Sequence, residues 1–229
     1  MQHSSRLLAS AIVAAMALLP IAQAQAAVIP GLFNTGTDAS NVALVGGNGV
    51  TDSHYQIVAS TNPAFIGQQA VTYHNPSYRL DDADSRWISS TATGGPSPGA
   101  STYRLVFDLT GLDPTTAQIT GVFDADNFAA ILLNGVATGD TVAGFALVNF
   151  TLNRGFVAGL NTLDFALTDF LPPTALWVDD LAGTADLAGA IPEPGSWAMM
   201  LLGFFGLGSV LRNRRRKAIR FAGVARLNR

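Results

Sequence analysis

The chain has 229 residues, of which 48% are hydrophobic and 13% are charged, and it contains no cysteine. This composition suits one folded domain with hydrophobic appendages, and it excludes disulfides, thiolate metal sites and a cysteine nucleophile. Between Val28 and Ile191 the chain has four arginines and fifteen aspartates but no lysine or glutamate, so this stretch carries a formal charge of −11. Phosphate binding needs clustered cations, so nucleic acid is excluded as a partner.

The first 26 residues have the layout of a secretory signal peptide. Arg6 precedes an apolar stretch from Leu7 to Ile21, and small residues then occupy alternate positions up to Ala26. Such small residues fit the cleft of signal peptidase, so we expect export and cleavage after Ala24 or Ala26. A folded domain is then expected over residues 27–185.

The segment after the signal peptide is predicted to form short strands. Apolar and polar residues alternate with a period of two from Tyr103 to Thr110 and from Leu163 to Thr168. Turn residues such as Asn134-Gly135 separate these runs. The pattern predicts an all-β fold, an antiparallel β-sandwich of jelly-roll type, with further strands at 55–59, 86–89, 118–123, 128–133, 145–152 and 175–181.

Two stretches of the predicted domain resemble the galactose-binding-like β-sandwich domains. They are YRLVFDLTGLDPTTAQITGVFDADNFAAILLNG, residues 103–135, and the later GFVAGLNTLDFAL. In these domains a strand leads to a loop that bears aspartate and asparagine, and a further strand ends in Asn-Gly. The resemblance implies the fold but leaves the ligand open, because this fold serves glycan binding, structural packing and enzyme appendages alike.

The sequence Gly95-Pro96-Ser97-Pro98-Gly99 matches the Gly-x-Ser-x-Gly motif of serine hydrolases. The residue after the serine must donate its backbone N–H to the oxyanion, and Pro98 has no N–H to donate. We therefore expect a loop here and a protein that is not an enzyme.

Two acidic groups are candidates for a ligand site. Asp124, Asp126 and Asn127 are expected to lie in a loop, and their oxygens suit Ca²⁺, which takes six to eight oxygen ligands. A separate cluster lies at Asp81-Asp82-Ala83-Asp84. The alternative interpretation is that these residues are solvated and bond to the local backbone of turns. Apart from this calcium ion, no cofactor is expected.

Aromatic side chains are the third candidates, because sugar-binding sandwiches stack pyranose rings on exposed aromatic faces. Trp87 and Trp177 lie in strand-like runs and are expected in the core. Tyr73 and Tyr78 lie in the loop VTYHNPSYRLDD, so these two are expected to be exposed.

Near the C-terminus, Pro192-Glu193-Pro194 precedes fifteen uncharged residues from Trp197 to Leu211. A helix of this length rises about 22 Å, which is short for a hydrocarbon core of about 30 Å unless the flanks contribute. We expect a transmembrane anchor with Trp197 at the interface and Leu201, Phe204 and Leu211 in the span. The positive-inside rule places the following basic residues in the cytoplasm and the acidic domain outside: Arg212, Arg214, Arg215, Arg216 and Lys217.

This order of motif, apolar span and arginine cluster resembles the PEP-CTERM sorting signal of Gram-negative bacteria. The resemblance implies that exosortase, a membrane transpeptidase, recognises Pro192, Glu193 and Pro194 and that the protein belongs with exopolysaccharide and biofilm. The expected organisation after the domain is a linker at 186–191, the sorting signal at 192–217 and an extension at 218–229.

Together these features predict an exported protein that is held in the inner membrane with a periplasmic domain, and that then reaches the cell surface or extracellular matrix. We expect it to bind or organise exopolysaccharide without catalysis. A scaffold that binds other matrix proteins is the alternative, and a glycan-active hydrolase is a less favoured one.

Overall fold

The computed structural model describes residues 26–95, 98–189, 200–208 and 212. Residues Gln25–Gly189 form one compact unit, and every named strand lies within it. The predicted signal peptide up to residue 25, the motif at 192–194, Trp197, Leu211 and residues 214–217 lie outside the described residues.

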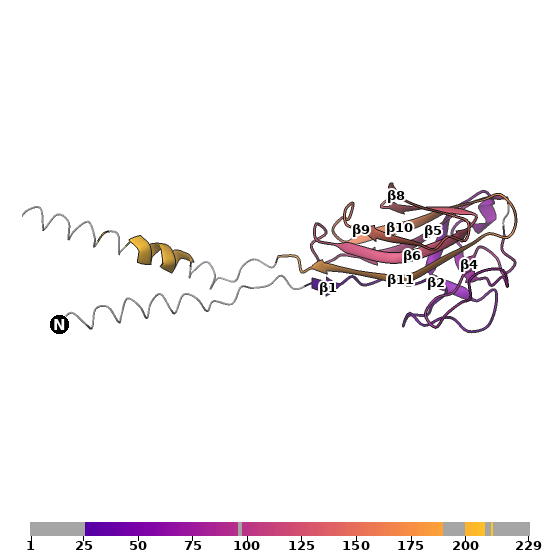
Figure 1. The fold of residues 1–229 in the computed structure, drawn as a ribbon, viewed down its shortest axis with the longest axis horizontal. Coiled ribbons are helices and arrows are strands. Elements are labelled where there is room, and N and C mark those ends of the chain that lie inside the picture. Colours follow the sequence, from indigo (N-terminus) through magenta and orange to yellow (C-terminus); the bar gives the residue numbers. More distant parts are fainter. Residues whose placement is uncertain (1–25, 96–97, 190–199, 209–211, 213–229) are drawn as a thin grey trace, which may run out of the picture. The chain divides into compact units, whose positions relative to one another are not determined.

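The compact unit is almost entirely β-structure (Figure 1). A single 3-10 turn, η2 at Pro63–Phe65, interrupts the strands, and Asn62 caps it by accepting a hydrogen bond from the backbone N–H of Ala64. The strands are β1 Ala26–Val28, β2 Thr51–Ser60, β3 Gln69–Thr72, β4 Ile88–Ser89, β5 Gly99–Asp108, β6 Gln118–Asp126, β7 Phe128–Leu133, β8 Val136–Ala143, β9 Val148–Leu152, β10 Leu160–Asp169 and β11 Ala175–Asp186.

The strands form one antiparallel hydrogen-bonded path that folds back over itself. Its order is β8-β7-β10-β5-β2-β3-β4-β11-β6-β9, and β1 pairs separately with β11. The chain crosses between the layers several times, since β5, β7 and β10 lie in one half of the path whereas β6, β9 and β11 lie in the other. The two halves face each other, because the ring of Phe165 on β10 lies 6.0 Å from that of Phe123 on β6 and 6.4 Å from that of Phe150 on β9.

The core lies between these two layers and follows from the alternation along each strand. On β5, Tyr103, Leu105 and Phe107 are buried, while Arg104 and Val106 between them point to the outer face. The sequence prediction of an all-β antiparallel sandwich is confirmed. Asn134 and Gly135, with φ of 52° and 78°, form the expected hairpin turn between β7 and β8.

Some strand boundaries differ from the prediction. The expected strand at 145–152 begins only at Val148, because Phe145 has a φ of 54°, which is incompatible with an extended chain. The expected strand at 86–89 is reduced to Ile88–Ser89. β3 and β8 were not predicted from the sequence. β8 is mostly exposed and contains Gly139 and Asp140, so no apolar alternation marks it.

The C-terminal unit is described only at residues 200–208 and 212, which are helical. Leu201 and Phe204 of the expected anchor lie in this helix. Among the described residues, no helix is both long enough and apolar enough to cross a membrane. The transmembrane anchor therefore stays a prediction.

Phe165 should be the most sensitive position of the core, because its ring contacts those of Tyr55, Phe123 and Phe150. Phe165→Ala is expected to lower the free energy of unfolding by about 3–5 kcal/mol, since it leaves a cavity between the layers. Urea unfolding measures this loss. The control Leu80→Ala, at a side chain that is 76% exposed, should change it by less than about 0.5 kcal/mol. A loss at Phe165 no larger than that of the control would contradict the assignment of the core.

Candidate functional site

A row of polar side chains crosses the outer face of the layer that contains β2, β5 and β10. The strand register places Gln69 opposite Gln56, Gln56 opposite Arg104, and Arg104 opposite Asp164. Directly paired residues of antiparallel strands project from the same face of a sheet. We call these four residues, Gln69, Gln56, Arg104 and Asp164, the polar row. It spans the four neighbouring strands β3, β2, β5 and β10.

Arg104 and Asp164 form a bidentate ion pair at one end of the row. Nε of Arg104 donates to Oδ1 of Asp164, and Nη2 donates to Oδ2, both at 2.7 Å. The hydrogen bonds to Asp164 raise the pKa of Arg104 above its usual value. The carboxylate is 5% exposed, whereas the guanidinium side chain is 36% exposed. A guanidinium has five N–H donors, so the pair is held in place and still offers donors to solvent.

A groove of about 280 Å³ lies along this row. Gln56, Gln69 and Arg104 line it, and Phe33 and His54 form its apolar wall. The rings of Phe33 and His54 stack with centroids 3.7 Å apart and planes inclined by 10°. The buried Tyr55 hydroxyl donates to the carbonyl of Phe33 at 2.8 Å and thereby fixes the position of that wall.

The base of this wall is also fixed by a buried carboxylate. Asp52 accepts hydrogen bonds from the backbone N–H groups of His54, at 2.8 Å, and Gly36, at 2.7 Å. Burial raises the pKa of Asp52. The groove thus combines amide, guanidinium and ring groups on a rigid sheet, and such an array can hydrogen-bond several hydroxyl groups of an extended ligand.

The structure places the predicted calcium loop elsewhere in the fold. Asp124 and Asp126 belong to β6 and are buried, so the expectation of a loop at these positions is wrong. The strand continues because β11 pairs with it as far as Asp126. The Tyr78 hydroxyl donates to Oδ2 of Asp126 at 2.6 Å, and Nδ2 of Asn127 donates to Oδ1 at 2.7 Å. Burial raises the pKa of both aspartates.

The expectation that Tyr73 and Tyr78 are exposed is also wrong, whereas the prediction that Trp87 and Trp177 are buried is confirmed. The two tyrosines join both tryptophans in a second apolar cluster, outside the main core. The rings of Tyr78 and Trp87 lie 4.6 Å apart. The guanidinium of Arg79 lies 5.1 Å from the centre of the Trp177 ring. These aromatic faces are therefore covered by protein.

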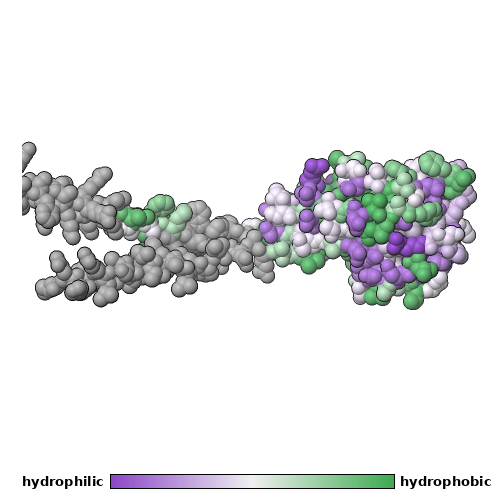
Figure 2. Space-filling view, in the orientation of Figure 1, coloured by the Kyte–Doolittle hydropathy of each residue, from purple (hydrophilic) through white to green (hydrophobic). Residues whose placement is uncertain are grey.

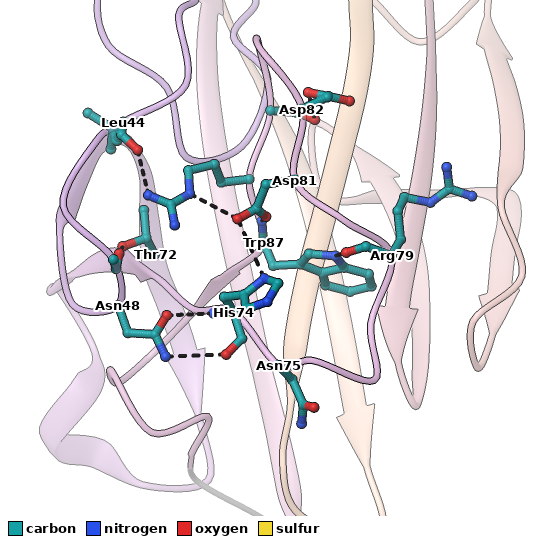
Figure 3. A network of polar contacts seen from close by, with 12 residues as sticks. Leu44, Asn48, Thr72, His74, Asn75, Arg79, Asp81, Asp82 and Trp87 are labelled. Carbon is teal, nitrogen blue, oxygen red and sulfur yellow. Dashed lines mark hydrogen bonds and ion pairs between the residues drawn. The ribbon is translucent and has the colours of Figure 1, made fainter.

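A network of polar contacts holds the loops that cover this cluster in place (Figure 3). Asp81 accepts a hydrogen bond from Nε of Arg86 at 3.1 Å, and Nδ1 of His74 lies 3.6 Å from the same carboxylate oxygen. Asn48 bonds both the backbone N–H and the carbonyl of His74. Arg86 in turn donates to the carbonyl of Leu44. The network joins two loops that are distant in the sequence.

A group of three carboxylates lies beside this network. Oxygens of Asp82, Asp84 and Asp179 lie within 4.8 Å of one another. Burial raises the pKa of Asp179 to about 6, and the charges of nearby aspartates add to this rise. A backbone hydrogen bond opposes part of it. Nδ2 of Asn34 donates to Asp179 at 2.8 Å. Oxygen donors are those that Ca²⁺ prefers, so these residues are the ones whose geometry could admit that ion.

The polar row was not predicted from the sequence. The alternation along β5 and β10 already put Arg104 and Asp164 on the polar side of their strands. The pairing that aligns them with Gln56 and Gln69 joins residues far apart in the chain, and no local pattern reports it.

Comparison with known proteins identifies the C-terminal segment. Residues 190–216 match the PEP-CTERM protein-sorting motif. The chain carries this sorting signal. The match includes Pro192, Glu193, Pro194 and Arg212, and it ends one residue before Lys217.

No curated protein matches the chain. Among solved structures, a mutant of a carbohydrate binding module family 29 is similar at 12% identity and a TM-score of 0.32, covering 61% of this chain and 97% of that one. The Stig cyclase Fisc from Fischerella sp. TAU is similar at 10% identity and a TM-score of 0.41, covering 72% and 100%. The CBM36-1 domain of a multidomain xylanase from the hindgut metagenome of Trinervitermes trinervoides is similar at 11% identity and a TM-score of 0.28, covering 72% and 99%. These values are too low to transfer a ligand or a site to this chain.

The raised pKa of Asp179 makes a prediction about stability. Its value in the folded state, about 6, lies above the usual 3.8, so the folded protein binds more protons between these values. Stability is then highest at low pH within this window, and it should fall as the pH rises through about 6. Asp179→Asn keeps an acceptor for Asn34 and should raise the melting temperature at neutral pH by several degrees and flatten its pH dependence.

Calorimetry of the native chain and the variant between about pH 4 and pH 7 measures this effect. Asp108→Asn is the matched control, because hydrogen bonds from Thr110 lower the pKa of the half-buried Asp108, so its replacement should not flatten the curve. An unchanged slope in Asp179→Asn would contradict the prediction. The same samples with added calcium test whether this ion binds. A rise in melting temperature that is lost in Asp179→Asn would place the ion at these carboxylates.

Proposed function

We propose that this protein is exported, processed by exosortase at its C-terminal motif, and then acts outside the cell as a non-catalytic component of the extracellular matrix. In this proposal signal peptidase removes the N-terminal segment, and the membrane holds the chain only until the tail is removed. The β-sandwich binds a neutral polysaccharide of the matrix along the polar row. The sorting motif at 190–216 supports the route, and the groove supports the ligand class.

The observation that carries the ligand proposal is the polar row itself. Its four side chains lie on paired strands, so neighbouring groups are about 5 Å apart along a straight line. A polysaccharide presents hydroxyl groups repeatedly along its length, and such a row can bond several of them at once. The sheet fixes the backbone of the groove and the ion pair fixes Arg104, so these groups lose little entropy on binding.

Charge favours a neutral polysaccharide over an acidic one. The segment from Val28 to Ile191 has a formal charge of −11, which repels polyanions at low ionic strength. In the groove itself Arg104 is already neutralised by Asp164. The pair offers hydrogen-bond donors to hydroxyl groups without presenting a net positive charge to an acidic sugar.

The same pair favours binding over hydrolysis. Cleavage of a glycosidic bond generally uses two carboxyl groups on either side of the bond, one of them with a raised pKa. The carboxylate of the polar row, Asp164, is instead held in a bidentate ion pair. This arrangement suits a group that positions Arg104, and it leaves the carboxylate poorly placed to donate a proton.

A protein scaffold is the second candidate, and an apolar patch favours it. Phe145 and Phe170 are 54% and 66% exposed, and Leu147 and Leu171 beside them are also exposed. The backbone N–H groups of Gly144 and Phe170 both donate to Asn127, which brings the two turns together. Exposed apolar side chains that gather in this way are typical of protein contacts. Figure 2 shows polar and apolar residues mixed over the visible face of the domain.

The groove is tested by removing the two exposed amides of the polar row together. Gln56→Ala with Gln69→Ala should weaken binding to neutral matrix polysaccharide by about 5- to 100-fold, since two hydrogen bonds of about 0.5–1.5 kcal/mol each are lost. Isothermal titration with the extracellular polysaccharide of the producing cells measures the affinity. Gln118→Ala, at an exposed glutamine in the opposite layer, is the matched control.

Equal affinity of the double variant and the control would contradict the groove as the site. Binding by neither the native chain nor the control would favour the scaffold function. Release of reducing sugar ends during the titration would overturn the non-catalytic part of the proposal.

The sorting route is tested with the native chain and Glu193→Ala in the producing cells. Exosortase processing should remove the tail, so mass spectrometry of the released protein should find no peptide from residues 200–208. Glu193→Ala should stay in the membrane fraction at full length. Leu187→Ala, just before the motif, is the control and should be released normally. Release of Glu193→Ala as efficiently as the native chain would show that the motif does not direct processing.

A further inference from the structure

A second cavity lies at an edge of the sandwich, away from β2 and β3 in the strand path. β8 and β9 are the two ends of the hydrogen-bonded strand path, and the cavity lies between their edges. Its volume is about 470 Å³, within the range of small-molecule sites. It shares no lining residue with the groove of the polar row. We call it the seam cavity, and its lining includes Leu133, Thr138, Asp140, Leu152, Asn153 and Arg154.

The first unusual feature of the seam cavity is Arg154. The described part of the sandwich has four arginines. Arg86 and Arg104 are paired with carboxylates, and Arg79 lies over the Trp177 ring. Arg154 forms no ion pair or hydrogen bond with any described residue, although the surrounding segment carries fifteen aspartates. Its guanidinium therefore has all its donors available at the cavity.

The second feature is a carboxylate on the facing wall. Asp140 lines the cavity from β8, and its Oδ2 accepts a hydrogen bond from Oγ1 of Thr138 at 2.7 Å. Asp140 and Arg154 do not form an ion pair. No nitrogen of Arg154 lies within 4.0 Å of a carboxylate oxygen among the described residues. The two opposite charges thus face the cavity without neutralising each other.

These features define the ligand class. Separated donor and acceptor walls suit a molecule that offers both hydroxyl hydrogens and hydroxyl oxygens. The side chains of Leu133 and Leu152 add an apolar surface for the C–H face of a ring, and Asn153 adds an amide. An anion would be attracted by Arg154 but repelled by Asp140, and a cation the reverse, so neither gains a net attraction, and we take a neutral polyhydroxylated ring as the ligand class.

We propose that the seam cavity binds a single neutral sugar unit, such as a branch or chain end of a polysaccharide. The inference rests on the proposed function and deepens it, because the open groove along the polar row suits an extended chain. β7 and β10 separate β8 from β5, so the two sites lie apart in the layer. One domain then holds two segments of polysaccharide at once and links them.

The test uses the full chain in mild detergent and monosaccharides as probes: D-glucose, D-galactose and D-mannose, with D-glucuronate as the anionic counterpart. Binding is followed by saturation-transfer NMR at tens of millimolar sugar. At least one neutral sugar should bind, and Arg154→Ala and Asp140→Asn should each weaken it by about tenfold, the effect of one charge-assisted hydrogen bond. The groove variant Gln56→Ala with Gln69→Ala should bind that sugar as the native chain does.

The outcomes separate the two sites. Polysaccharide binding without any monosaccharide binding, or monosaccharide binding unaffected by Arg154→Ala, would overturn the seam cavity and leave the polar row intact. Tighter binding of D-glucuronate than of every neutral sugar would overturn the neutral ligand class. Loss of polysaccharide binding in the groove variant with unchanged binding of the monosaccharide would support both sites.

A cross-linking assay provides a second readout. The native chain should increase the viscosity of a polysaccharide solution, because each domain would hold two segments. Arg154→Ala should still bind the polymer but should lose this increase. An equal increase with Arg154→Ala would contradict the linking role.

Discussion

The pairing of β5 with β10 is the interaction on which the sandwich depends. In this register Tyr103 faces Phe165 on the inner side, and Arg104 faces Asp164 on the outer side. A slip of β10 by one residue would turn Phe165 to solvent and bury Asp164, while β5 would keep Tyr103 inside and Arg104 outside. The bidentate ion pair can form only in the observed register, so the same pairing that builds the core also fixes the polar row.

The two layers use their outer faces differently, and this asymmetry decides where a ligand has access. Outside β6 and β11, Val122 and Trp177 are covered by Tyr78 and Trp87 in the second apolar cluster. The network around Asp81 holds the covering loops in place. Outside β2 and β5, no comparable aromatic cluster covers the polar row in the described residues, and the groove remains open. The outer face of one layer is thus covered by loops, whereas the groove on the outer face of the other is open to solvent.

The strands in which apolar and polar residues alternate could be predicted from the sequence. The features that depend on contacts between residues distant in the chain could not. The strands around Tyr103 and Leu163 alternate cleanly, and the hairpin at Asn134-Gly135 needs only two residues with positive φ. β8 has no such pattern because it is an edge strand with a bulge and few buried residues.

The errors at Tyr78 and Asp126 have one common cause. Tyr78 lies in a polar loop and Asp126 in an acidic run, so each on its own resembles exposed surface. In the fold they are hydrogen-bonded to each other at 2.6 Å and buried together. A tyrosine hydroxyl and a carboxylate satisfy each other away from water, and only the tertiary structure brings these two together.

The strand pattern would allow the proposed cleavage at both ends without loss of the sandwich. The chain enters and leaves the domain at neighbouring positions, because Ala26 pairs with Asp186 and the N–H of Ile29 donates to the carbonyl of Gly183. β11 ends at Asp186, and the sorting motif begins at residue 190. Removal of the tail at that motif would therefore break no strand pairing. At the other end, cleavage after Ala24 would keep all of β1, whereas cleavage after Ala26 would remove a paired residue. Since the core and both cavities lie between these ends, cleavage there would leave the sandwich and its cavities intact.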